Sequence, residues 1–115
     1  MERQYRLRRS LDFVRVRREG QSWAHPLLVL AADQNGRPTS RFGFVTGKRV
    51  GNAVQRNRAR RLMRESVRRH LDRVPPGWDC ILIARALLIT ATFAQVEAAV
   101  IQLLQRANLW QAADE

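Results

Sequence analysis

Apolar and polar residues alternate along this chain in patterns that predict three helices and three clear strands. Short apolar or alternating runs typical of strands occupy residues 27–32 (LLVLAA), 41–46 (RFGFVT) and 78–84 (WDCILIA). Apolar residues at helical spacing are found at residues 11–18, in the segment that follows Asn52, and at residues 92–107. Residues 22–24 are a candidate further strand that would add pairing before Pro26.

Capping and turn residues set the expected boundaries of these elements. Ser10 and Asn52 are predicted N-caps, and Thr92 with Gln95 has the spacing of a capping box. Gly20 is expected to end the first helix, and Pro75-Pro76-Gly77 to stop the middle one, because proline lacks the amide that a helix needs. Residues 33–38, with Asn35-Gly36 inside, form a turn signal.

The order helix, two or three strands, helix, strand, helix predicts an α+β two-layer sandwich with helices packed on a small mixed sheet. At 115 residues and 45% apolar composition, the chain is expected to form one folded domain over residues 1–115. Its ends, residues 1–9 and 108–115, are expected to be flexible.

The middle helix has two opposite faces. At about 100° per residue, one side carries small or apolar residues together with a histidine: Ala59, Leu62, Met63, Ser66, Val67 and His70. The other side carries Arg56, Asn57, Arg58, Arg60, Arg61, Arg64 and Arg68. Residues 51–69 contain seven arginines and a single acid, Glu65, whereas a solvated helix normally interleaves acids with its bases. We therefore expect a binding face for a polyanion rather than a merely solvated surface.

The overall charge supports nucleic acid as that polyanion. The formal net charge is +11 and the sequence pI is about 11.7. Only Lys48 among the 21 basic residues is a lysine. Arginine binds phosphate through two hydrogen bonds and stacks on bases, which fits RNA, although a GC-rich coding sequence explains the same bias equally well.

Residues that could carry catalysis are scattered. His25 and His70 are far apart, Asp12, Glu65 and Asp79 form no metal-ligand pattern, and we expect neither a catalytic side chain nor a metal site. The single cysteine, Cys80, is expected to fill the core. No signal peptide or membrane span is evident, so a cytoplasmic protein is expected.

Phe13 and Arg17 lie four residues apart and share a face of the first helix. Such a pair could stack unpaired bases, while the alternative is that Phe13 packs in the core. The sequence pattern alone favours the core.

The residues around the middle helix resemble a known family. Lys48-Arg49-Val50-Gly51-Asn52-Ala53-Val54, followed by Arg56-Asn57-Arg58-Ala59-Arg60-Arg61 and Arg64-Glu65, resembles the "RNR" signature of the bacterial ribonuclease P protein subunit. The resemblance extends over nearly the whole chain through Arg6-Leu7, Asp12-Phe13 with Val16 and Gly20, Arg41-Phe42-Gly43, residues 79–85, and Thr92-Phe93.

The resemblance implies an α-β-β-β-α-β-α order with a left-handed βαβ crossover around the middle helix. It implies a subunit that assists a catalytic RNA, one protein per RNA, in the Mg²⁺-dependent removal of 5′ leaders from precursor tRNA. The Mg²⁺ belongs to the RNA active site, and no cofactor is bound by the protein alone. By carry-over the RNA would be bound by Lys48, Arg49, Asn52, Arg56, Asn57, Arg58, Arg60 and Arg61, and the helical angles add Arg64 and Arg68. A cleft for the leader would be lined by Phe13, Arg17, Val29, Ala31 and Val45.

Three positions depart from the family pattern. Arg17 stands where a second aromatic is frequent, Ala31 where a tyrosine is frequent, and Ala86 where a basic residue is frequent. The resemblance therefore implies a cleft that stacks fewer bases and depends more on charge. Two other functions remain open: a general RNA-binding or ribosomal-type protein without a role in cleavage, and an autonomous metal-dependent nuclease.

Overall fold

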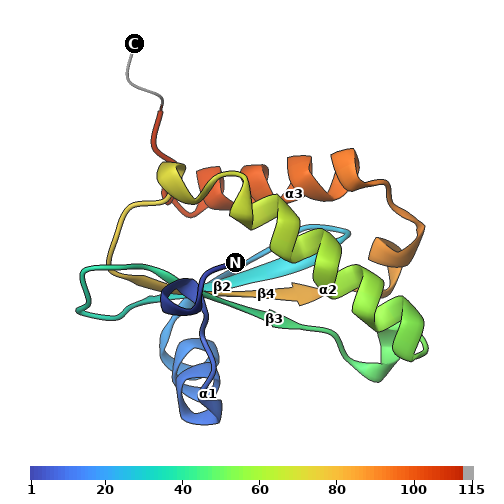
Figure 1. The fold of residues 1–115 in the computed structure, drawn as a ribbon, viewed down its shortest axis with the longest axis horizontal. Coiled ribbons are helices and arrows are strands. Elements are labelled where there is room, and N and C mark those ends of the chain that lie inside the picture. Colours follow the sequence, from blue (N-terminus) through green and yellow to red (C-terminus); the bar gives the residue numbers. More distant parts are fainter. Residues whose placement is uncertain (113–115) are drawn as a thin grey trace.

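The computed structural model describes residues 1–112, and Figure 1 shows its helices and strands. In chain order these are α1 Ser10–Glu19, β1 Gln21–Ala24, β2 Leu28–Gln34, β3 Arg41–Val45, α2 Ala53–Arg68, β4 Trp78–Ala84 and α3 Phe93–Arg106. Short 3-10 helices occupy Arg3–Tyr5, Lys48–Val50, Leu71–Arg73 and Ala86–Thr90. The predicted α-β-β-β-α-β-α order is confirmed, and the candidate strand at residues 22–24 belongs to β1.

The four strands form one mixed sheet in the order β1-β2-β4-β3. β1 pairs with β2 and β2 with β4 in antiparallel fashion, whereas β3 and β4 are parallel. Two adjacent parallel strands need a crossover connection, and α2 is that connection. It is the crossover whose left-handed sense the resemblance implies. β3 is an edge strand because it lies at the end of the strand order, and the chain continues from its carboxyl end to α2.

Helices cover both faces of the sheet (Figure 1). α2 and α3 pack on one face over the main core, which contains Leu28, Leu30, Phe42, Cys80 and Leu82. The opposite face carries a smaller cluster beneath α1, formed by Leu7, Val16, Ala31 and Ile81. The predicted two-layer sandwich describes the sheet with α2 and α3, and α1 adds a third layer. It does so because β2 and β4 are apolar at both sets of alternate positions, so each face needs a cover.

The predicted caps of α2 and α3 are confirmed. Asn52 and Gln55 form a reciprocal capping box, as do Thr92 and Gln95. The predicted cap of α1 is wrong by one residue, because Arg9 holds the N-cap position and offers no side-chain bond. α2 ends at Arg68, earlier than the proline stop predicts. The chain leaves the helix there and buries Val74 in the main core before it reaches the prolines.

Both terminal segments contain residues that pack on the body. Leu7 is 5% exposed, and its amide donates to the Phe42 carbonyl at 2.9 Å. Leu109 is 2% exposed, and the Gln111 amide donates to the Arg73 carbonyl at 2.6 Å. These residues are therefore attached to the fold, and the part of the expected flexible tail at 113–115 lies outside the described residues. Within residues 1–112, no helix has the length and apolar character needed to cross a membrane.

Candidate nucleic-acid interface

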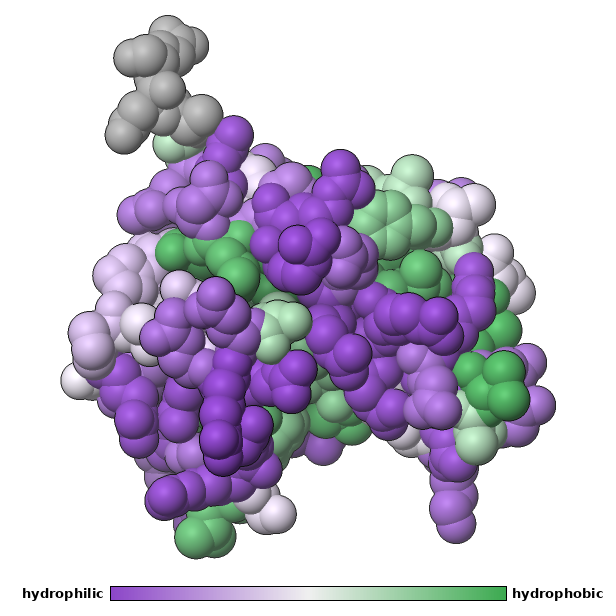
Figure 2. Space-filling model, in the orientation of Figure 1, coloured by the Kyte–Doolittle hydropathy of each residue, from purple (hydrophilic) through white to green (hydrophobic). Residues whose placement is uncertain are grey.

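Buried small and apolar residues lie on one side of α2 and exposed basic residues on the other, as the helical pattern predicts. Ala59, Met63, Ser66 and Val67 are buried against the main core. We call the predicted RNA-binding residues of α2 the arginine face: Arg56, Asn57, Arg58, Arg60, Arg61, Arg64 and Arg68. All seven are exposed or partly exposed, and Figure 2 shows a largely hydrophilic surface over this helix.

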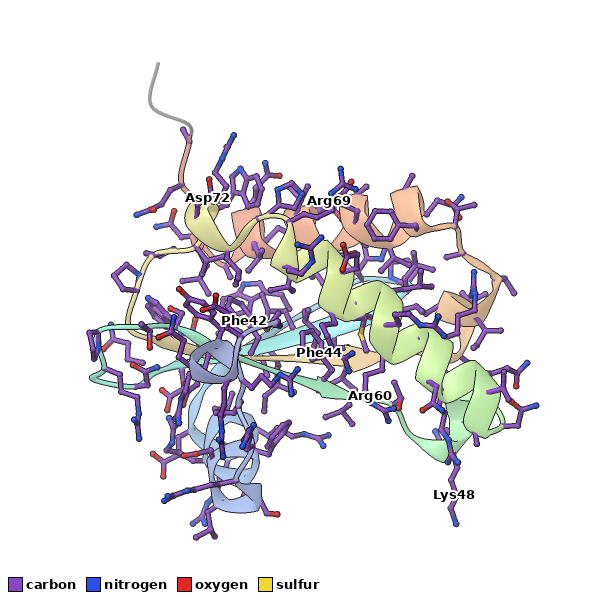
Figure 3. All side chains as sticks on the ribbon, viewed as in Figure 1. Phe42, Phe44, Lys48, Arg60, Arg69 and Asp72 are labelled. Carbon is purple, nitrogen blue, oxygen red and sulfur yellow. The ribbon has the colours of Figure 1, made fainter. Side chains whose placement is uncertain are left out.

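Some of these side chains are held by neighbouring segments, which limits their freedom before any ligand binds. Arg60 donates to the Thr46 hydroxyl at 2.7 Å and to Asn57 Oδ1 at 2.9 Å, so it lies toward the end of β3 (Figure 3). Arg58 donates to the carbonyl oxygens of Ile89 and Ala91 at 3.1 and 3.3 Å on the other flank. These contacts fix two guanidinium groups on opposite sides of the helix and spread positive charge over a wide surface.

Arg68 differs from the other arginines of the face because it is paired with an acid. Its Nε donates to Glu65 Oε2 at 2.9 Å, and a second contact joins Nη2 to Oε1. The hydrogen bond from Arg68 holds the pKa of Glu65 below its usual value. Within residues 1–112, Arg56, Arg61 and Arg64 form no side-chain hydrogen bond or ion pair. The uncompensated charge therefore lies toward the first three turns of α2.

The loop before α2 adds further basic groups. Lys48 and Arg49 are both exposed, and Lys48 extends away from the body in Figure 3. Asn52 has a structural role, since its Oδ1 accepts from the Gln55 amide at 2.9 Å. Gly51 has φ +142°, and a side chain there would collide with Gln55, the capping-box partner of Asn52. The loop conformation that presents Lys48 and Arg49 thus depends on the start of the helix.

The sheet face beneath α1 is organised in three rows that run across β2, β4 and β3. The first, the charged row, is Asp33–Asp79–Arg41. The second is Ala31–Ile81–Gly43, and the third, the apolar row, is Val29–Ile83–Val45. The second row is buried under α1, whereas the apolar row is only partly buried. The apolar row is thus the part of this face that a ligand can reach.

Of the predicted leader-binding residues, Val29 and Val45 lie in this apolar row, and Ala31 lies in the second row beside it. Phe13 of α1 is partly buried and, like Val45 and Ile83, packs against the small cluster beneath α1. It also lies directly over Gly43, where a side chain would overlap its ring. Arg17 is exposed, four residues further along α1 on the same side of the helix. Ala31 is only 4% exposed, because α1 covers it. Ile83 was not predicted; its alternation with Ile81 in β4 is the signal that could have placed it there.

The charged row surrounds a carboxylate that is completely buried. Asp79 is 0% exposed and accepts hydrogen bonds from Arg41, from Arg15 of α1, and from Asn35 at 2.9 Å. Arg15 also donates to Asp33 at 2.6 Å. Burial alone would raise the pKa of Asp79, but the hydrogen bonds from Arg41 and Asn35 outweigh it and lower this pKa. An acid inside an apolar strand requires cationic partners, and this rule could have identified Asp79 in the sequence.

Other residues with reactive or ionisable side chains are buried or contact neighbouring side chains of the fold. Cys80 is fully buried, as predicted, and burial raises the pKa of its thiol to about 12. His70 is partly buried, and its Nε2 lies 3.1 Å from Oε2 of Glu97. Asp12 is near Arg15 and Arg41, at 3.7 and 3.6 Å. Among residues 1–112, no three His, Cys, Asp or Glu side chains are grouped so that they could hold a metal ion.

Comparison with known proteins gives consistent similarities over the full length. A family model described as Ribonuclease P matches residues 1–108. The chain is 50% identical over 115 residues to the ribonuclease P protein component of Roseiflexus sp. (strain RS-1), covering 99% of this chain and 94% of that protein. It is 47% identical over 110 residues to the corresponding protein of Herpetosiphon aurantiacus, covering 96% and 89%.

Solved structures give the same result for the fold. The RNase P protein of Staphylococcus aureus matches with a TM-score of 0.85 at 30% identity, covering 93% of this chain and 98% of that one. The RNase P protein of Thermotoga maritima matches with a TM-score of 0.80 at 33% identity, covering 88% and 96%.

Proposed function

Because this chain belongs to the ribonuclease P protein family, we propose that its arginine face binds the RNA subunit and its α1 side binds the substrate leader. Members of the family are protein components of ribonuclease P, a tRNA-processing ribonucleoprotein endonuclease that contains an RNA partner. Our proposal concerns which surface of this chain binds the RNA subunit and which binds the precursor tRNA.

One observation carries the RNA-binding proposal: α2 buries its apolar side in the core and leaves the arginine face on the surface. Phosphate contacts made by such a face release condensed counterions from the RNA, which favours binding. Lys48 and Arg49 extend the basic surface past the start of the helix, and Asn52 maintains that start through its cap. Arginine suits this role because its planar fork matches phosphate oxygens in pairs.

The second part assigns the leader of precursor tRNA to α1 and the apolar row. Single-stranded RNA is commonly held by aromatic stacking beside basic groups. Phe13 offers a partly exposed ring over this surface, Arg17 offers a cation on the same side of α1, and Val29 and Val45 offer apolar contacts. With one aromatic and one arginine, this surface favours general contact with the strand over recognition of particular bases.

The proposal gives the protein no catalytic side chain. Bond cleavage would belong to the RNA, whose active site requires Mg²⁺ to activate water and stabilise the leaving oxygen. The protein, one copy per RNA in the cytoplasm, would reduce the repulsion between two polyanions and so lower the Mg²⁺ concentration that the reaction needs.

A reconstitution tests this function against its alternatives. The purified chain, ribonuclease P RNA and precursor tRNA are combined at low Mg²⁺, and each component is omitted in turn. We expect 5′ cleavage to be stimulated only when protein and RNA subunit are both present. A general RNA-binding protein would leave cleavage unchanged, and an autonomous nuclease would cut precursor tRNA without the RNA subunit. Either result would overturn the proposal.

A further inference from the structure

A groove runs along the open edge of β3, between the N-terminal segment and α2. Its volume is about 220 Å³, and it is lined by Arg6, Arg8, Arg60, Arg64, Phe13 and Phe44 together with Met1, Leu7, Phe42 and Gly43. No aspartate or glutamate is among its lining residues. Figure 3 shows Phe44 and Arg60 along this edge. The groove is distinct from the apolar row, but Phe13, which lines the groove, packs against the same cluster as Val45 and Ile83 of that row.

The N-terminal segment forms one wall of the groove because it is attached to β3. Arg6 makes a parallel bridge with Phe42, and the buried Leu7 side chain fixes the segment against the α1 face. Arg6 Nε donates to the Met1 carbonyl at 3.1 Å, and Arg8 is exposed. The opposite wall comes from α2, where the contact with Thr46 holds Arg60 toward β3. Arg60 and Arg64 also belong to the arginine face, so the groove lies where the two proposed RNA-binding surfaces meet.

The floor of the groove includes a stretch of unpaired strand edge. Leu7 pairs with the Phe42 carbonyl, but within residues 1–112 no segment pairs with the outer edge of β3 at Phe44. Peptide groups alternate between the two edges of a strand, so Phe44 directs its amide and carbonyl to the same side as Phe42. The groove thus combines four guanidinium groups, two aromatic rings and free main-chain hydrogen-bonding groups.

These features identify the chemistry of the occupant. Four cations without an acid favour phosphates, and the rings and peptide groups suit the faces and edges of unpaired bases. The volume is below the roughly 300 Å³ at which ordinary small-molecule pockets begin, so it fits one part of an extended polymer better than a free ligand. Phe13 lines the groove and lies over Gly43, which is beside Val45 of the apolar row on β3, so a strand that passes Phe13 can reach the groove.

We propose that the β3-edge groove is a second binding site for the single-stranded leader, which receives the nucleotides that extend beyond Phe13. This inference rests on the proposed function and extends it, since it predicts that longer leaders gain contacts with Arg8. The strand would pass between the N-terminal segment and Arg64 of α2, along the outer edge of β3.

The test uses the reconstituted holoenzyme and a series of precursor tRNAs whose leaders lengthen one nucleotide at a time, blocked against cleavage. Affinity is compared at fixed salt for the wild-type chain, Arg8→Glu, Arg8→Lys and Arg37→Glu. Arg37 is exposed and lies in the loop between β2 and β3, away from the groove lining, so its reversal is the matched control for charge. Melting curves verify that each variant is folded.

We expect Arg8→Glu to weaken binding about tenfold, as for the loss of about one charge-assisted contact, but only above a threshold leader length. Arg8→Lys should retain most of the affinity, and Arg37→Glu should behave like the wild type. An equal loss at every length, including mature tRNA, would place Arg8 against the RNA subunit or the tRNA body and overturn the inference. An absence of any loss would do the same. If the wild-type chain stimulates cleavage in either case, the proposed function survives and only the groove assignment fails.

Discussion

Arg41 on β3 holds both carboxylate oxygens of Asp79 on β4, with Nε 2.9 Å from Oδ1 and Nη2 2.7 Å from Oδ2. Arg15 contacts the same carboxylate from α1, the helix that covers this face of the sheet. The pair therefore connects two parallel strands and the helix that covers them. Phe13 lies two residues from Arg15 in α1, so this contact and the Phe13 ring both belong to the packing of α1 on the sheet.

Replacing Asp79 with asparagine should destabilise the protein by about 3 kcal/mol at neutral pH, because Arg15 and Arg41 would lose a buried counter-charge. Denaturant unfolding followed by circular dichroism measures this change. Asp33→Asn is the matched control, since Asp33 contacts Arg15 but is 26% exposed, and we expect a loss of about 1 kcal/mol or less. Equal effects of the two variants would contradict a special role for the buried carboxylate.

The same carboxylate predicts an acid-dependent stability. The pKa of Asp79 is lowered in the folded state, so the unfolded chain binds the proton more readily than the folded chain does. Its contribution is present above the unfolded pKa of about 3.9 and is lost as the pH falls through the lower folded value. The Asp79→Asn variant should thus lose less stability than the wild type below about pH 4. Parallel curves for both proteins in that range would contradict this assignment.

Gly43→Ala should displace the Phe13 ring without unfolding the protein. The new Cβ would overlap the end of the ring, which can move outward because Phe13 is only partly buried. We expect a stability change of about 1 kcal/mol and weaker binding of precursor tRNA by the holoenzyme. Gly47→Ala is the control, since nothing lies within 4 Å of a Cβ there and its φ of −81° suits any residue. Unchanged precursor affinity in Gly43→Ala would argue against a binding role for the Phe13 position.

Phe13→Ala should weaken the binding of precursor tRNA by about 1–3 kcal/mol, the usual cost of losing one stacked base. Binding of mature tRNA should be unchanged because it has no leader. Val14→Ala, at a neighbouring residue that is 54% exposed, provides the comparison on the same helix. An equal loss of affinity for precursor and mature tRNA would contradict the binding of the leader at this surface.

The arginine face predicts a strong dependence of RNA binding on salt. Replacing Arg56 and Arg60 with alanine should reduce the slope of log K against log salt by about 0.7–0.9 for each lost phosphate contact. Arg18 and Arg37 are both exposed and lie outside α2, so their double alanine variant is the control. A slope that is identical in the two double variants would count against docking through α2.

Cys80 should react with thiol reagents only when the protein unfolds. Its thiol is fully buried with a pKa raised to about 12, so almost no thiolate is present at pH 8 in the folded state. As the only cysteine in the chain, it reports on global opening without interference. Labelling should follow the denaturant curve, whereas labelling at the rate of a free thiol in native buffer would contradict the burial.

The sequence by itself determined the features that depend on local spacing. The faces of α2 follow from helical periodicity, and the caps at Asn52 and Thr92 follow from side chains that reach the nearest free amides. The limits of β4 also agree with its apolar run, because that strand is buried on both faces. These properties need no information about distant segments.

Only the tertiary structure decided which distant residues meet. Strand register brings Asp33, Asp79 and Arg41 into one row, and the parallel pairing of β3 with β4 leaves the edge where Arg8 and Arg64 form opposite walls of a groove. The cover of the second sheet face by α1, and the burial of Ala31 beneath it, depend on that same packing. Register and helix placement minimise the free energy of the whole assembled chain, so local pattern cannot supply them.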